Sequence, residues 1–74
     1  MRLPEPKNIV VIHKTQQRQA EKWCREQLGQ RWEAIGNRSG LWCCFWAGNK
    51  DHDKYRFYFQ NEKDALVFGL KWAS

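Results

Sequence analysis

The sequence has little that would support a metal site or a disulfide framework. Its three cysteines are an odd number, two of them are adjacent, and none belongs to a Cys-x-x-Cys pair. Structural zinc sites need about four convergent ligands, usually delivered in such close pairs. We therefore expect no metal, no cofactor, and the reduced thiols of a cytoplasmic protein. The residues that such a metal or thiol site would use are His13, Cys24, Cys43, Cys44 and His52.

Long apolar runs and catalytic motifs are also missing. No apolar segment approaches the ~20 residues of a membrane span, and no charged leader precedes an apolar segment as in a secretory signal. The chain lacks a nucleophile elbow, a phosphate-binding glycine loop and a spaced pair of carboxylates. These absences predict a protein that is not an enzyme and does not bind membranes.

Aromatic residues and positive charge are abundant instead. The 74 residues include five Trp, four Phe and two Tyr, and the net charge is +5. Residues 1–31 carry seven basic and three acidic side chains, a balance of +4 that leaves +1 for the remainder. A chain of this length hides only about 60% of the surface that its unfolded form exposes. Some aromatic side chains should therefore lie at the surface, where they can bind a partner.

The residue pattern predicts six elements after an N-terminal tail at 1–6, all within one domain at 7–74. Strands are expected at 7–13, 31–35, 41–47 and 54–60, and helices at 16–28 and 62–73, with Thr15 and Asn61 as N-caps and Gly29 after the first helix. This β-α-β-β-β-α order favours an α+β two-layer sandwich. We expect a four-stranded mixed or antiparallel sheet with two helices on one face.

The stretch at 41–47 is apolar throughout, so both faces of its strand are apolar. Alternation places Trp42, Cys44 and Trp46 on one face. In the strand at 54–60, Arg56 and Tyr58 share a face. We predict a partner-binding surface that combines Trp42, Trp46 and Tyr58 with Arg56 at its rim, because Trp, Tyr and Arg are the usual anchors of protein interfaces.

An alternative use of the strand at 54–59 is nucleic-acid binding. Basic and aromatic residues alternate there, as in platforms that stack single-stranded bases, and the strand loosely resembles the aromatic strand of an RNA-recognition motif. It departs from that motif in its missing glycines, its aliphatic companion strand and its element order. The competing interpretation is that Tyr55, Phe57 and Phe59 are core residues.

The two helices offer further surfaces. Lys14, Arg18, Lys22 and Arg25 gather on one side of the first helix, with Arg31 as a further candidate, and form a basic face. It would contact phosphates or steer an acidic partner, unless pairing with Glu21 and Glu26 makes it merely solvated. The apolar arc of the last helix spans about 200°, wider than the ~100° needed to rest on a sheet. The extra width calls for the first helix or a second subunit, which would make a homodimer.

The segments WCRE (23–26), NRSGLWCCFWAG (37–48), YRFYF (55–59) and NEKDA (61–65) resemble small bacteriophage proteins of uncharacterised function. This resemblance implies a non-enzymatic accessory protein that binds and modulates or inhibits a host protein in the host cytoplasm. No functional residue is carried over from it. The alternative function is binding of single-stranded nucleic acid, or antagonism of a host nucleic-acid machine in the manner of an anti-CRISPR protein.

Overall fold

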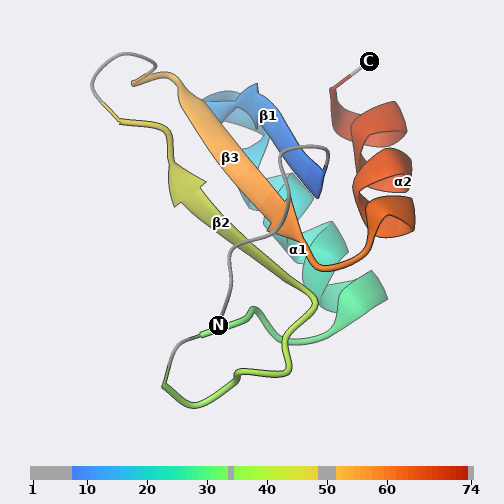
Figure 1. Cartoon of the computed structure of the whole chain (residues 1–74). Helices are drawn as coiled ribbons and strands as arrows, with labels where there is room; N and C mark the ends of the chain where they lie inside the picture. Colours follow the sequence, from blue (N-terminus) through green and yellow to red (C-terminus); the bar gives the residue numbers. More distant parts are fainter. Residues whose placement is uncertain (1–7, 34, 49–51, 74) are drawn as a thin grey trace.

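The computed structural model describes residues 8–33, 35–48 and 52–73, and its main elements follow in the order strand, helix, strand, strand, helix (Figure 1). The predicted tail at 1–6 lies outside these residues. The elements are β1 (Ile9–His13), the 3-10 turn η2 (Lys14–Gln16), α1 (Gln17–Leu28), β2 (Trp42–Trp46), β3 (Lys54–Phe59) and α2 (Glu62–Trp72).

The sheet has three antiparallel strands in the order β1-β3-β2. β3 is therefore inserted between β1 and β2, which run parallel to each other and are joined through α1. This is a split β-α-β unit, and α2 follows it. The predicted α+β class is confirmed, whereas the four-stranded sheet is not.

The predicted strand at 31–35 does not form in the described part of that segment. Its backbone makes one bridge, between Glu33 and Asn37, and Trp32 donates one hydrogen bond to the Trp42 carbonyl oxygen at 2.7 Å. The Asn37 side chain donates to the Arg31 carbonyl oxygen at 2.8 Å, and Gly36 has a φ of 106° that favours glycine. These contacts fold the segment into a tight turn beside β2, so that it cannot extend a ladder along the strand.

The helix ends agree with the sequence in part. Gly29, with φ 87°, ends α1 as predicted and donates its N–H to the Arg25 carbonyl oxygen at 3.1 Å. Thr15 is not the N-cap of α1: it lies in the preceding 3-10 turn, where its N–H donates to His13 Nδ1 at 3.2 Å. Asn61 precedes α2 as expected, although its side chain donates to the Asp64 carboxylate at 3.2 Å and does not accept a hydrogen bond from a backbone N–H of the helix.

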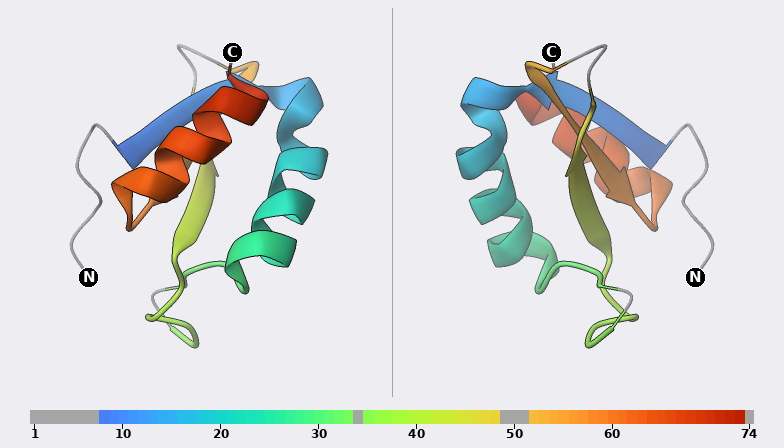
Figure 2. Two further views of the ribbon diagram at one scale, coloured as in Figure 1. Left: turned by 90° about the vertical axis from the view of Figure 1, so that its right-hand side faces the viewer. Right: turned by 90° about the vertical axis from the view of Figure 1, so that its left-hand side faces the viewer.

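Both helices pack on the same face of the sheet, as predicted, and the left-hand view of Figure 2 shows them in front of the strands. Small residues of α1 and α2 let the helices approach the strands closely, and Phe68 fills the space between the layers. Its ring centroid lies 4.7 Å from that of Phe57 and 4.9 Å from that of Phe59. The core comprises Ile12, Ala20, Cys24, Trp42, Cys44, Phe57, Phe59, Ala65 and Phe68. Neither described helix has the length and apolar content needed to cross a membrane.

Candidate functional site

The second face of the sheet carries no helix, and we call it the open face. Residues opposite one another in an antiparallel pair share a face, so the strand register fixes its composition. The rows across the sheet are Ile9–Tyr58–Cys43, Val11–Arg56–Phe45 and His13–Lys54. None of these positions in the three described strands carries an acidic side chain. The open face is therefore aromatic, aliphatic and basic. Its exposed part is centred on Val11 and Phe45, which are 46% and 45% exposed, whereas Cys43 is buried at 1% exposed.

Two aromatic rings meet at the centre of the open face. Phe45 is 45% exposed, and its ring contacts the Tyr58 ring edge-on, with centroids 5.7 Å apart and planes at 72°. Arg56 lies directly across from Phe45 on the neighbouring strand and is exposed. The Arg31 guanidinium stands over the Phe45 ring, 5.3 Å from its centroid. Cations thus flank an exposed ring.

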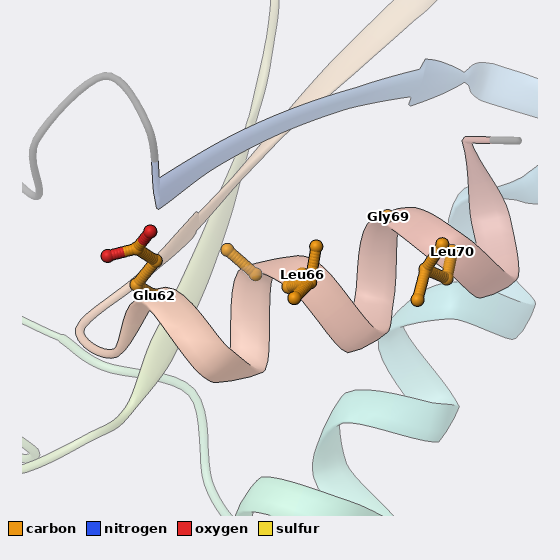
Figure 3. A pocket seen from close by; sticks show the side chains of 5 residues that line it. Glu62, Leu66, Gly69 and Leu70 are labelled. Carbon is orange, nitrogen blue, oxygen red and sulfur yellow. The ribbon is translucent and has the colours of Figure 1, made fainter.

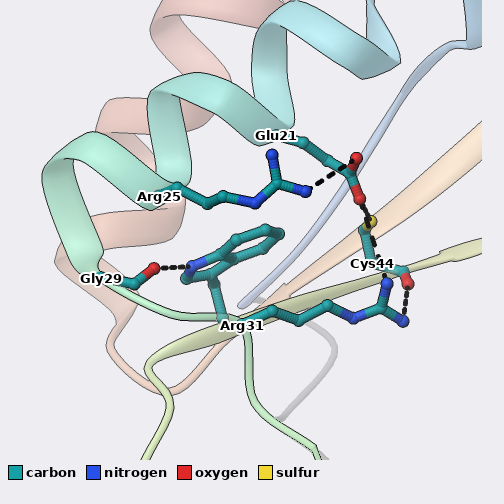
Figure 4. A network of polar contacts seen from close by, with 6 residues as sticks. Glu21, Arg25, Gly29, Arg31 and Cys44 are labelled. Atoms are coloured by element: carbon teal, nitrogen blue, oxygen red, sulfur yellow. Dashed lines mark hydrogen bonds and ion pairs between the residues drawn. The ribbon is translucent and has the colours of Figure 1, made fainter.

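Arg31 is held in place by contacts around the free edge of β2 (Figure 4). Its Nη2 donates to the Cys44 carbonyl oxygen at 2.9 Å, and its Nη1 lies 4.0 Å from Glu21 Oε1. Glu21 also accepts from Cys44 Sγ at 2.8 Å and pairs with Arg25 at 3.7 Å. Burial and the hydrogen bond to Glu21 raise the pKa of the Cys44 thiol, which keeps it protonated as a donor. The network fixes the guanidinium before any ligand arrives.

The predicted partner-binding set is divided between the two faces of the sheet. The register pairs Trp42 with Phe59 and Trp46 with Tyr55, on the helix side, whereas Tyr58 and Arg56 lie on the open face. The prediction that all four share one surface is therefore wrong.

The two tryptophans also differ in exposure. Trp42 is 1% exposed, stacks on Phe57 and donates from Nε1 to the Gly29 carbonyl oxygen at 2.8 Å, so it is a core residue. Trp46 is 50% exposed and donates to the His52 carbonyl oxygen at 2.8 Å.

The aromatic alternation of β3 serves the core. Phe57 and Phe59 are fully buried, and Tyr55 packs against the same cluster, as the competing interpretation of that strand requires. Phe45 is not among the predicted site residues, although its alternation with Trp42 places it on the opposite face of β2. Arg31 is predicted only as an extension of the basic helix.

The basic face of α1 is exposed at all four of its predicted positions, Lys14, Arg18, Lys22 and Arg25. Lys14 belongs to the 3-10 turn and the others to α1. The expected intrahelical pairs form: Lys22 lies 4.0 Å from Glu26, and Arg25 lies 3.7 Å from Glu21. Since α1 packs on the other side of the sheet, this basic face does not join the open face.

A separate apolar surface lies on α2. Leu66 is 62% and Leu70 is 67% exposed, with the exposed Val67 beside them. A cavity of about 290 Å³ runs along this helix, lined by Glu62, Ala65, Leu66, Gly69 and Leu70 (Figure 3). Part of the wide apolar arc of this helix therefore stays exposed and does not pack against the core.

The described histidines, cysteines and carboxylates include no group of three placed to hold a metal ion, and the cysteines are free thiols. No protein-family model matches the chain, and neither a curated protein nor a solved structure does.

Proposed function

We propose that this is a non-enzymatic binding protein that holds single-stranded nucleic acid on the open face of its sheet. The observation that carries the proposal is the exposed Phe45 ring flanked by the cations Arg31 and Arg56. Single-stranded nucleic acids are bound by aromatic side chains that stack on bases, combined with cations that follow the phosphates. Every base has a π-face, so such a surface tolerates many sequences.

The charge distribution supports the same proposal. Arg31, Lys54 and Arg56 bring three cations to the open face or its edge, and the chain as a whole carries a net charge of +5. Asp53 lies close to this surface but next to His13, 3.5 Å from its Nε2. With three phosphates neutralised, the logarithm of the binding constant should fall with the logarithm of salt concentration with a slope of about −2.

Fluorescence anisotropy with labelled oligonucleotides tests the proposal. Phe45→Ala should weaken binding about 5-fold or more, because stacking of a base on an aromatic ring contributes about 1–3 kcal/mol. Val67→Ala is the matched control, since it truncates an exposed apolar side chain on the other side of the sheet. Circular dichroism of each variant reports whether the fold is retained.

A second pair of variants separates the open face from the basic face of α1. Arg56→Gln should weaken binding and reduce the salt slope by about 0.7, whereas Arg18→Gln, on α1, should change both much less. Failure to bind any oligonucleotide at low salt would overturn the proposal. So would a larger effect of Arg18→Gln than of Arg56→Gln, which would move the phosphate contacts to α1.

The second candidate function is contact with a protein, and the observation that favours it is the exposed apolar stripe of Leu66, Val67 and Leu70 on α2. A host protein target, a bacteriophage origin and a cytoplasmic location remain predictions from the sequence. The simplest occupant of the stripe is a second copy of this chain. Light scattering should then give twice the chain mass of 8.9 kDa, and Leu66→Lys should restore the monomer. A wild-type monomer at all concentrations would contradict self-association.

A further inference from the structure

A cavity of about 420 Å³ opens at the edge of the open face, lined by Arg31, Trp32, Glu33 and Phe45. Its volume lies within the range of about 300–1,000 Å³ that is usual for small-ligand sites. Phe45 belongs both to this cavity and to the exposed aromatic pair. The cavity is therefore continuous with the surface on which we propose that single-stranded nucleic acid lies. A nucleotide next to one stacked on the open face would therefore reach it.

The walls of the cavity suit a flat ligand. The Arg31 guanidinium is fixed by the Cys44 carbonyl oxygen and by the Phe45 ring, as described above. Trp32 is anchored by its backbone, which donates to the Trp42 carbonyl oxygen at 2.7 Å and lies against Gly40. Bases in single strands stack on aromatic rings and on guanidinium planes. Both kinds of surface line this one cavity and are held by the fold.

Glu33 is the acidic residue in the lining of the cavity. Its N–H donates to the Asn37 carbonyl oxygen at 2.9 Å, which fixes the residue at the start of the turn. Within the described part of the chain, no ion pair engages its carboxylate, and the residue is exposed. An ionised carboxylate only accepts hydrogen bonds. Guanine alone among the four bases offers two adjacent donors, N1–H and N2–H, on its Watson–Crick edge; the other bases place an acceptor beside each donor.

We propose that this cavity binds one guanine base of the single strand, with Arg31, Trp32 and Phe45 holding the ring and the Glu33 carboxylate accepting from N1–H and N2–H. The inference rests on the proposed function, because it assigns base preference to the same surface. It makes the protein selective for guanine at one position of an otherwise sequence-tolerant strand.

Competition anisotropy with short oligouridylates of equal length tests this assignment. The probes are all uridine, or carry one central guanosine, adenosine or cytidine. The guanosine oligonucleotide should bind roughly 5-fold tighter or more, the lower end of the discrimination given by a bidentate contact to a base. Glu33→Gln should remove that preference and leave the binding of the all-uridine probe. Glu26→Gln, which makes the same charge change on α1, should keep the preference.

The outcomes separate this inference from the proposed function. If the all-uridine probe binds and Phe45→Ala weakens it, but guanosine gives no gain, the guanine site is overturned and the binding face stands. A guanosine preference that persists in Glu33→Gln also overturns the assignment of the carboxylate. If no oligonucleotide binds, both proposals fail together.

Discussion

Replacing each of two tryptophans by phenylalanine tests the placement of β2, because both lie on the same strand. Trp42 is buried, and Trp42→Phe removes its hydrogen bond to Gly29, worth about 1 kcal/mol net. The substitution also removes about two buried carbon groups from the core, and each loss lowers the free energy of unfolding by about 0.8 kcal/mol. The free energy of unfolding should fall by about 2–3 kcal/mol. Trp46→Phe acts on a half-exposed side chain and should cost less than about 1 kcal/mol.

Urea denaturation followed by far-ultraviolet circular dichroism measures both changes without relying on tryptophan fluorescence. A protein of this size unfolds with a slope of about 1 kcal/mol per molar urea. The midpoint should therefore drop by about 2–3 M for Trp42→Phe and by less than about 1 M for Trp46→Phe. Equal shifts, or a larger shift for Trp46→Phe, would refute the placement of Trp42 in the core and of Trp46 at the surface.

The types of five elements, and their ends to within one or two residues, follow from the sequence because they depend on neighbouring residues. The alternation in β3 correctly predicts that Phe57 and Arg56 lie on opposite faces of the sheet, since one side of that strand is charged. The stop at Gly29 follows from the ease with which glycine adopts a positive φ. Ala20 and Cys24 are buried, as the helical spacing requires.

The composition of the open face could not be predicted, because it depends on contacts between distant segments. β2 is apolar on both faces, so its sequence does not indicate which side packs against the helices. Only the pairing with β3, which sets Phe45 opposite Arg56, shows that Phe45 lies on the face without helices. The strand order has the same origin: β3 lies between β1 and β2 although it follows both in sequence.

The segment after α1 shows a local pattern overridden by its turn. Alternation at 31–35 favours a strand, but the Asn37 side chain binds the backbone of Gln30 and Arg31 and closes the chain on itself. The free edge of β2 is then covered by the Trp32 N–H and the Arg31 side chain instead of a fourth strand. The cavity beside Phe45 forms because the turn replaces a fourth strand, and the sequence pattern at 31–35 does not indicate this turn.

Two glycines and the buried thiols give further predictions. Gly40→Ala would place a Cβ 2.4 Å from the Trp32 backbone, so the melting temperature of this variant should fall sharply. In Gly69→Ala the new Cβ would lie 3.9 Å from Val10 Cγ2, an ordinary contact, and the free energy of unfolding should rise by up to about 1 kcal/mol because alanine has the higher helix propensity. Stability should also fall above pH 9. Burial raises the pKa of Cys24 from 9.0 to about 12 and raises those of Cys43 and Cys44 as well. The unfolded thiols lose their protons first, so the folded state holds more protons and the free energy of unfolding falls as the pH rises, by up to about 1.4 kcal/mol per pH unit for Cys24 between about pH 9 and 12. Urea midpoints on either side of pH 9 measure the slope, and Cys24→Ala should reduce it; a slope that this variant leaves intact would contradict the assignment.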